Sequence, residues 1–177
     1  MSQAQRHRLF FALDPPPQVR REIEALQRGL GVAGRAVPAP NFHVTLAFLG
    51  MQPPEVIPVA SAVAAELEFP SCAVVFDRLG SFRRAGVLWL GVSEVPEALA
   101  AFQHDLVGGL LAAGVGYDRK PWKFHLTLYR KMRNPPPTMG PIAIPWRLRG
   151  FGLVESVSVN RGVEYHTIAA WNAAPRG

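Results

Sequence analysis

Short apolar runs alternate with helical patterns along this chain. Runs rich in β-branched and aromatic residues, bounded by Gly or Pro, are typical of strands. Such runs predict strands over residues 8–13, 42–49, 71–79, 87–92, 124–129, 146–159 and 163–171, with a bend in the sixth at 150–152. The third and fourth runs flank a basic turn at Arg83 and Arg84, so we expect them to pair as a hairpin.

Apolar residues at helical spacing predict three helices between these strands. The first begins within Pro15–Pro17 and closes at Gly29, with Asp14 as its N-cap. The others cover residues 53–67 and 96–113. Residues 134–137 are expected to form a surface loop, and the tail from residue 172 is expected to be loose.

One pentapeptide occurs twice. Residues 42–46 read Phe-His-Val-Thr-Leu and residues 124–128 read Phe-His-Leu-Thr-Leu, so the copies differ only in their third residue. Side chains alternate between the faces of a strand, so the histidine and threonine of each copy share one face. Each copy therefore presents an imidazole beside a hydroxyl on a strand whose other face is buried.

The elements around the two copies follow a similar order, because a strand and then a helix precede each motif strand. This order predicts two pseudo-symmetric lobes that each lend one motif strand to a shared cleft. The predicted class is α+β, with mostly antiparallel sheets that face the cleft and helices on the outside. At this length, residues 1–177 are expected to form a single bilobal domain.

Composition and charge favour a polyanionic partner. The chain is 49% hydrophobic, which is ample for a core, and its formal net charge of +6 suggests nucleic acid as the ligand. The single cysteine, Cys72, excludes an intramolecular disulfide and fits a reducing compartment. No apolar run is long enough to span a bilayer, and no signal peptide is evident, so a cytoplasmic protein is expected.

Paired histidines suit acid–base chemistry at phosphorus. The unperturbed histidine pKa of about 6.5 lets one ring accept a proton while the other donates one. His43 and His125 can thus serve the entering and leaving oxygens of an in-line displacement. Thr45 and Thr127 can donate hydrogen bonds to the charged phosphoryl oxygens. This chemistry requires no cofactor.

A zinc site is the competing interpretation of paired histidines. Zinc sites take a third or fourth ligand at a recognisable spacing, and this chain has one cysteine and no His-x-x-x-His motif. The sequence therefore favours a site without metal. The remaining histidines lack the repeated frame and are not site candidates: His7, His104 and His166.

The two His-x-Thr motifs in apolar strands resemble the two-histidine phosphoesterase superfamily. Within it, the chain is most similar to the RNA 2',3'-cyclic phosphodiesterases, also called 2'-5' RNA ligases (LigT-like). Phe124 departs from the family, which usually has proline before the second motif. The likeness covers nearly the whole chain and is carried by Arg8–Leu13, His43–Gly50, His125–Arg130, Ser156, Gly162 and Tyr165.

The resemblance implies hydrolysis of RNA-terminal 2',3'-cyclic phosphate to a 2'-phosphate, with O3' as the leaving oxygen. It implies His43 as general acid and His125 as general base, although the sequence alone leaves the reverse order open. It adds Arg130 to Thr45 and Thr127 as a phosphate-binding residue. Strict alternation would put Arg130 on the face opposite His125, so a bulge, the strand end or the length of the side chain must bring its charge round.

Basic and aromatic residues crowd the second motif and are expected to bind the RNA upstream of its end. The candidates are Arg119, Trp122, Lys123, Tyr129 and Lys131. Among the aromatic residues, Trp122 and Tyr129 are expected to be exposed. The alternative for the charged residues is a solvated rim without RNA contacts.

Three other functions compete with this interpretation. The same site could join RNA ends through a 2'-5' linkage, or act on 2'-5' oligoadenylate or a small cyclic nucleotide. A non-catalytic RNA-binding module is the third, but phosphate binding alone would more simply use Arg and Lys. The predicted enzyme is a monomer that acts on RNA and not at a membrane.

Overall fold

The structure, a computed structural model, describes residues 5–134 and 138–173. In chain order its elements are β1 (His7–Leu13), α1 (Pro17–Gly29), β2 (Arg35–Ala36), the 3-10 helix η1 (Ala39–Asn41), β3 (Val44–Gln52), α2 (Val56–Ala65), β4 (Cys72–Phe76), β5 (Arg78–Phe82), the 3-10 helix η2 (Arg83–Ala85), β6 (Val87–Gly91), α3 (Glu97–Ala112), β7 (His125–Arg130), β8 (Ile144–Leu148), β9 (Gly150–Val159) and β10 (Gly162–Asn172). The expected α+β class is confirmed.

The larger sheet runs in the order β10-β9-β1-β3-β7-β6-β5, with β2 beside β7. Each of its pairings is antiparallel, and the strands β3 and β7 that carry the two motifs are neighbours. β3 and β7 pair at Val44 and Leu126. The sheet therefore divides at the motifs, with β1, β9 and β10 on one side and β5 and β6 on the other.

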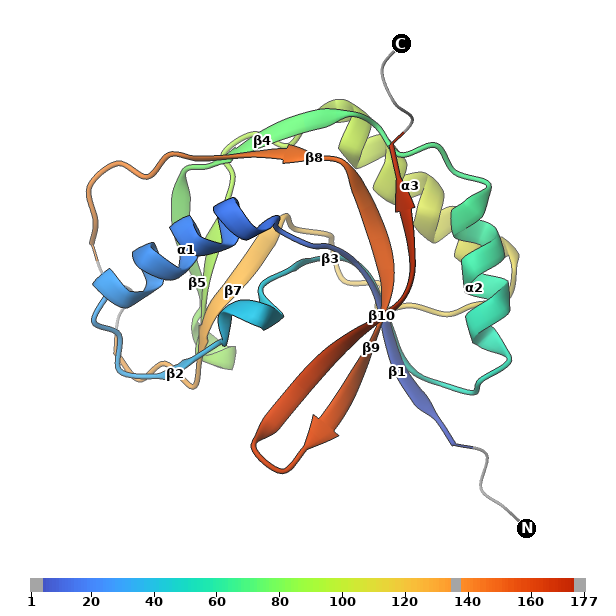
Figure 1. The fold of residues 1–177 in the computed structure, drawn as a ribbon, viewed down its shortest axis with the longest axis horizontal. Helices are drawn as coiled ribbons and strands as arrows, with labels where there is room; N and C mark the ends of the chain where they lie inside the picture. Colours follow the sequence, from blue (N-terminus) through green and yellow to red (C-terminus); the bar gives the residue numbers. More distant parts are fainter. Residues whose placement is uncertain (1–4, 135–137, 174–177) are drawn as a thin grey trace.

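The helices cross over between these two halves of the sheet. In Figure 1, α1 lies on the side of β5 and β7, whereas α2 and α3 lie on the side of β9 and β10. Gln27 of α1 donates a hydrogen bond to the carbonyl of Leu128 in β7. Gln103 of α3 donates one to the carbonyl of Leu46 in β3. The helix that precedes each motif strand is thus bonded to the other motif strand.

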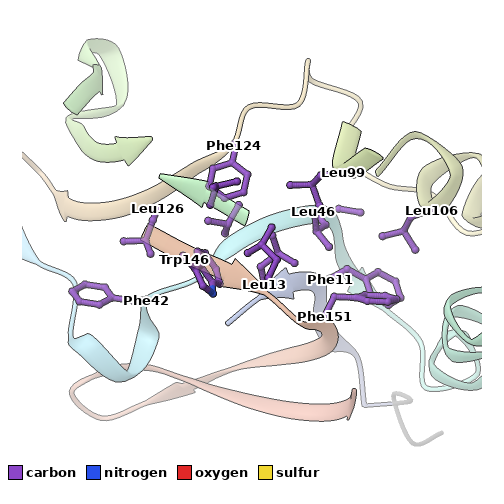
Figure 2. Close-up of a cluster of buried hydrophobic side chains, with 14 of the residues drawn as sticks. Phe11, Leu13, Phe42, Leu46, Leu99, Leu106, Phe124, Leu126, Trp146 and Phe151 are labelled. Carbon is purple, nitrogen blue, oxygen red and sulfur yellow. The ribbon is translucent and has the colours of Figure 1, made fainter. Parts of the chain in front are cut away.

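One hydrophobic core joins the two halves. Figure 2 shows apolar side chains from both halves of the sheet and from α3 in one cluster. Leu46 and Leu126, which lie within the two motifs, are almost fully buried in it. Because the apolar face of each motif strand is fixed by this packing, the histidine and threonine face is fixed as well.

The predicted run over 71–79 is two strands that lie in different sheets. β4 pairs with β8 in a separate two-stranded sheet, and β5 pairs with β6. Only the second part therefore forms the expected hairpin. Asp77 lies between the two strands and accepts hydrogen bonds from the backbone and side chain of Ser93. This polar junction interrupts what the apolar pattern suggests is one strand.

Three boundaries also differ from the prediction. The run over 146–159 breaks at Arg149, between β8 and β9, rather than bending at 150–152. The first motif strand continues past Gly50 to Gln52. Asp14 does not cap α1, whose N-cap is Pro16, but forms an ion pair with Arg20. The expected loop over 134–137 and the expected loose tail fall largely outside the described residues.

Candidate active site

His43 sits immediately before β3, where η1 turns the chain into the sheet. Its Nδ1 donates a hydrogen bond to the carbonyl of Asn41 at 2.8 Å. A neutral ring that donates through Nδ1 has its lone pair on Nε2. This Nε2 lies 3.0 Å from Thr45 Oγ1, whose hydroxyl can donate to it. The histidine and threonine of the first motif therefore act as one hydrogen-bonded pair.

His125, the first residue of β7, is held in the same way. Its Nδ1 donates a hydrogen bond to the carbonyl of Lys123 at 2.9 Å. In both motifs the acceptor is the backbone carbonyl two residues before the histidine. The neutral form of each ring thus carries its reactive lone pair on Nε2, which matches what acid–base catalysis requires.

The strand register brings the two motifs side by side in one sheet. Val44 pairs with Leu126 in an antiparallel ladder. The residue before Val44, His43, therefore lies opposite the residue after Leu126, Thr127. By the same register, Thr45 comes opposite His125. Residues directly opposite in such a ladder are close enough for their side chains to interact. The two motif strands are thus neighbours in one sheet, whereas the single site formed by their side chains stays a prediction, as does the symmetry of whole lobes.

A bulge follows each threonine. Ala12 pairs with Thr45 and Phe11 with Ala47, which leaves Leu46 as an extra residue in β3. In β7 the partners of Trp89 and Leu88 are Thr127 and Tyr129, which leaves Leu128 as the extra residue. The carbonyls that accept hydrogen bonds from the crossing helices belong to these two bulge residues. Because a bulge disrupts the ladder, an outside donor satisfies the carbonyl that it displaces.

The second bulge turns Arg130 toward the site. Leu128 and Tyr129 are consecutive, yet both are buried in the core, and Arg130 is exposed. The extra residue shifts the alternation of side chains by one position after Leu128. Arg130 therefore lies on the same face of β7 as Thr127. Its charge acts on the pKa of both His43 and His125. Of the three possibilities that the sequence left open, the bulge is the one that the structure contains, and the phosphate-binding role of Arg130 stays a prediction.

Aromatic rings enclose both imidazoles. His43 contacts Phe10 and Tyr165, with ring centroids 4.9 and 5.0 Å away. His125 lies edge-on to Phe82 at 5.2 Å and to Trp89 at 6.3 Å. These rings restrict the orientation of each imidazole and displace water from one side of it.

The indole ring of Trp89 lies beside His125. A Cβ atom on Gly80, its partner in β5, would lie 2.1 Å from the indole, so only glycine leaves room for this ring. The ammonium of Lys123 lies 4.1 Å from the Trp89 ring centroid. This cation–π contact holds a positive charge next to the second motif.

The surroundings disfavour a charged imidazole in the free protein. Burial is the main cause that lowers the pKa of His43 to about 4. The positive charges of Arg130 and Arg20 lower it further, against the hydrogen bond to Asn41. Burial also lowers the pKa of His125, and the charges of Lys123 and Arg130 act in the same direction. A phosphate anion bound among these groups would raise the pKa of both histidines and so oppose the effect of the positive charges.

The predicted RNA-binding residues divide into two groups. Arg119, Lys123 and Lys131 are exposed, as a rim requires. The expectation that Tyr129 is exposed is wrong, because the bulge buries its ring and its hydroxyl donates to the carbonyl of Gln27. A buried ring cannot stack on a base. Trp122 is half-buried, and its indole donates to the carbonyl of Thr45 at 2.9 Å, which anchors the chain that leads to the second motif.

The part of the chain that the structure describes contains no group of three or more His, Cys, Asp or Glu side chains able to hold a metal ion. No described helix is long and apolar enough to cross a membrane. The site's polar groups are instead imidazoles, hydroxyls and a guanidinium, which are donors for an anion.

A family model described as the 2'-5' RNA ligase superfamily matches residues 15–156. The chain belongs to this superfamily. It is 34% identical to the RNA 2',3'-cyclic phosphodiesterase of Escherichia coli K12, over 77% of this chain and 80% of the relative. It is 33% identical to the Thermus thermophilus protein of the same name, over 89% and 86% of the two chains. The crystal structure of E. coli LigT complexed with 3'-AMP superposes with a TM-score of 0.88 at 28% identity, covering 97% of this chain and all of that one.

Sequence reasoning overlooked the two glutamines of this superfamily member. Gln27 lies four residues after Ile23 and three before Leu30, both buried. Gln103 lies four residues after Leu99 and three before Leu106, also on a buried stripe. A glutamine on the apolar face of an amphipathic helix is the signal that could have identified them, because a buried amide must find a partner.

Proposed function

We propose that this protein hydrolyses RNA-terminal 2',3'-cyclic phosphates to 2'-phosphates by acid–base catalysis with His43 and His125. The observation that carries the proposal is the equivalent way in which both rings are held, each by Nδ1, on opposed motif strands. The relatives in E. coli and Thermus thermophilus are named for this activity.

In the proposed reaction, water attacks phosphorus from the side opposite O3'. His125 Nε2 takes a proton from the water as its oxygen bonds to phosphorus. His43 gives the proton on its Nε2 to O3' as the P–O3' bond breaks. The products are a 2'-phosphomonoester and a 3'-hydroxyl, and one water has been consumed. Proton exchange with solvent then restores both histidines.

The phosphoryl oxygens gain negative charge in the transition state. Thr45 and Thr127 donate hydrogen bonds to them, and Arg130 adds a charge-assisted donor. Thr45 also contacts His43 Nε2, so its hydroxyl is placed between the acid and the phosphate. These three side chains supply the stabilisation that a metal ion provides in other phosphodiesterases.

The acid role of His43 depends on the substrate. With a pKa of about 4, His43 is neutral at pH 7 in the free protein. The negative charge of the cyclic phosphate favours the imidazolium and raises this pKa. Binding of the anion therefore supplies the proton that His43 later delivers. A neutral end, such as a methylated phosphate, would bind without charging the ring.

Ligation is the second candidate, because the matching family is described by that activity. It replaces water with the 5'-hydroxyl of a second RNA, which attacks the same phosphorus and leaves a 2'-5' linkage. The same two proton transfers apply. Since water is far more concentrated than RNA ends, hydrolysis dominates. We further propose that the protein acts as a cytoplasmic monomer without a metal ion.

The test uses a short RNA that ends in 2',3'-cyclic phosphate, incubated with purified protein in EDTA. The expected product is the 2'-phosphate, and either His43→Ala or His125→Ala should lower kcat by about a hundredfold or more. His104→Ala is the matched control, because this histidine is exposed on α3 outside the site. Equal activity in all three variants, or turnover that EDTA abolishes, would overturn the proposal.

A further inference from the structure

A cavity opens beside His43 on the face of the sheet that carries the first motif. Its volume is about 850 Å³, which is within the range of ligand-binding pockets. One wall is the start of α1, with Arg20 and Arg21. The other is formed by Arg147 in β8 and by Arg149, which follows this strand. Of the five residues proposed for catalysis and phosphate binding, His43 alone lines this cavity, so the proposed chemistry leaves most of the cavity unexplained.

A row of small residues forms its floor and leads to the catalytic motif. Ala170 pairs with Gly152, Gly152 with Ala12, and Ala12 with Thr45, so four neighbouring strands contribute to one row. A Cβ atom on Gly152 would lie 3.3 Å from the Thr167 methyl, which shows how little room the floor leaves for a larger residue. Larger side chains line the next row, so the small residues leave a trough that ends at Thr45.

Arginine dominates the charge of the walls. Four arginines and two acids line the cavity. One acid, Asp14, is paired with Arg20. Arg147 and Arg149 alternate with the buried residues of β8, and neither has an ion pair or a side-chain hydrogen bond within residues 5–134 and 138–173. Two such arginines that line one trough can each bind a phosphate, which suits a nucleic-acid strand better than a single small anion.

We propose that this cavity binds the ribonucleotides that immediately precede the cyclic phosphate, with their phosphodiesters on Arg147 and Arg149. The inference rests on the proposed function, since the cyclic phosphate lies at the 3' end and the chain must leave the site in the 5' direction. The trough that ends at Thr45 provides this path. The cavity thus selects a polynucleotide end over a free cyclic nucleotide.

The first experiment compares two substrates, 2',3'-cyclic AMP and an eight-nucleotide RNA with a 2',3'-cyclic end. In the double variant Arg147→Gln/Arg149→Gln, kcat/KM for the RNA should fall about tenfold or more, whereas that for the mononucleotide should change less than about twofold. The control variant Arg28→Gln/Arg78→Gln removes the same charge at exposed residues that do not line the cavity, and should leave both substrates unchanged. Equal losses on both substrates, or equal losses in both double variants, would overturn the proposal.

A second variant tests the path without changing charge. Ala170→Trp places a large side chain on the floor of the cavity, and because Ala170 is exposed this change should leave folding intact. It should weaken the RNA substrate and spare the mononucleotide. An unchanged kcat/KM for the RNA would show that the chain leaves by another route.

Binding separates this inference from the proposed function. His43→Ala is titrated with the same RNA carrying a 3'-phosphate end, and fluorescence anisotropy is followed at several salt concentrations. Adding Arg147→Gln/Arg149→Gln should lower the slope of log Kd against log salt by about 1.4, for two lost phosphate contacts on a single strand. An unchanged slope refutes the cavity as the RNA site even if hydrolysis occurs. A lowered slope supports it even if no turnover is found.

Discussion

Gln27 and Gln103 make the same hydrogen bond to the two copies of one motif. Gln27 Nε2 lies 2.8 Å from the Leu128 carbonyl and Gln103 Nε2 lies 3.0 Å from the Leu46 carbonyl. Both acceptors are bulge residues that follow the motif threonines. Each helix therefore fixes the bulge of the strand that it does not directly precede. The two halves of the site are linked through these crossed contacts.

Replacing these glutamines with leucine tests that link. Gln27→Leu should lower the free energy of unfolding by about 1 to 3 kcal/mol, because the half-buried carbonyl of Val37 loses its side-chain donor and the buried carbonyl of Leu128 loses one of its two donors. Gln103→Leu should cost less, since this side chain is only half-buried. Urea denaturation measures both. Gln18→Leu, exposed on the same helix as Gln27, should change stability by less than about 0.5 kcal/mol.

The pH dependence of kcat/KM should be bell-shaped with its maximum on the acidic side of neutrality. The profile reports the pKa values of the free enzyme's acid and base. One is about 4 for His43, and the other is below the ordinary 6.5 for His125. Below the lower pKa both rings are protonated and no base remains, whereas above the higher pKa both are neutral and no acid remains. Initial rates at low substrate concentration measure this profile, and a maximum above pH 7 would contradict it.

Folding stability should also fall as the pH drops from 6.5 toward 4. Over this range the unfolded chain takes up a proton on His43, and the folded chain does not, so acid favours unfolding. The shift in pKa corresponds to at most about 3 kcal/mol. Unfolding of the wild type and of His43→Asn should be compared at both ends of the range. The part of the pH dependence that His43→Asn removes is the contribution of this ring, and an identical pH dependence would refute it.

Arg130 should contribute to both rate and pH dependence. Arg130→Gln removes a charged donor from the phosphoryl oxygens and should lower kcat by about a hundredfold. It also removes a charge that lowers the pKa of His43 and His125, so the basic limb of kcat/KM should move to higher pH. Arg133→Gln, also exposed but past the strand, is the control and should do neither. A lower kcat with an unchanged basic limb of kcat/KM would show that the Arg130 charge does not set the pKa values of the two histidines.

The repeated motif predicted from sequence which of its side chains share a face, because alternation along a strand depends only on local geometry. His43 and Thr45 share a face for that reason, and so do His125 and Thr127. The pairing of β3 with β7 in one sheet was not predicted, because the sequence indicated only two motif strands that face a shared cleft. The strand over 8–13 and the three helices followed from apolar spacing, within a few residues at their ends.

Tyr129 shows where local patterns fail. A bulge adds one residue to the strand, so every later side chain changes face, and whether a bulge forms depends on partners far away in the chain. Leu128 can bulge because two donors far earlier in the chain, the Gln27 side chain and the Val37 backbone N–H, satisfy its carbonyl. The split of the run over 71–79 has the same kind of cause, because the partner of β4 is β8, much later in the chain. Such pairings are tertiary, and an apolar run alone does not encode them.

The identity of the general acid is best tested with sulfur in place of O3'. A thiolate leaves without a proton, because thiols are far more acidic than alcohols, so a substrate with a bridging 3'-sulfur no longer needs the acid. If His43 is the acid, His43→Ala should lose about a hundredfold on the oxygen substrate and recover most of that loss on the sulfur substrate. His125→Ala should lose activity equally on both, since attack by water still needs a base. Recovery by His125→Ala instead would exchange the two roles while leaving the two-histidine chemistry intact, and recovery by neither would mean that O3' leaves without protonation by these rings.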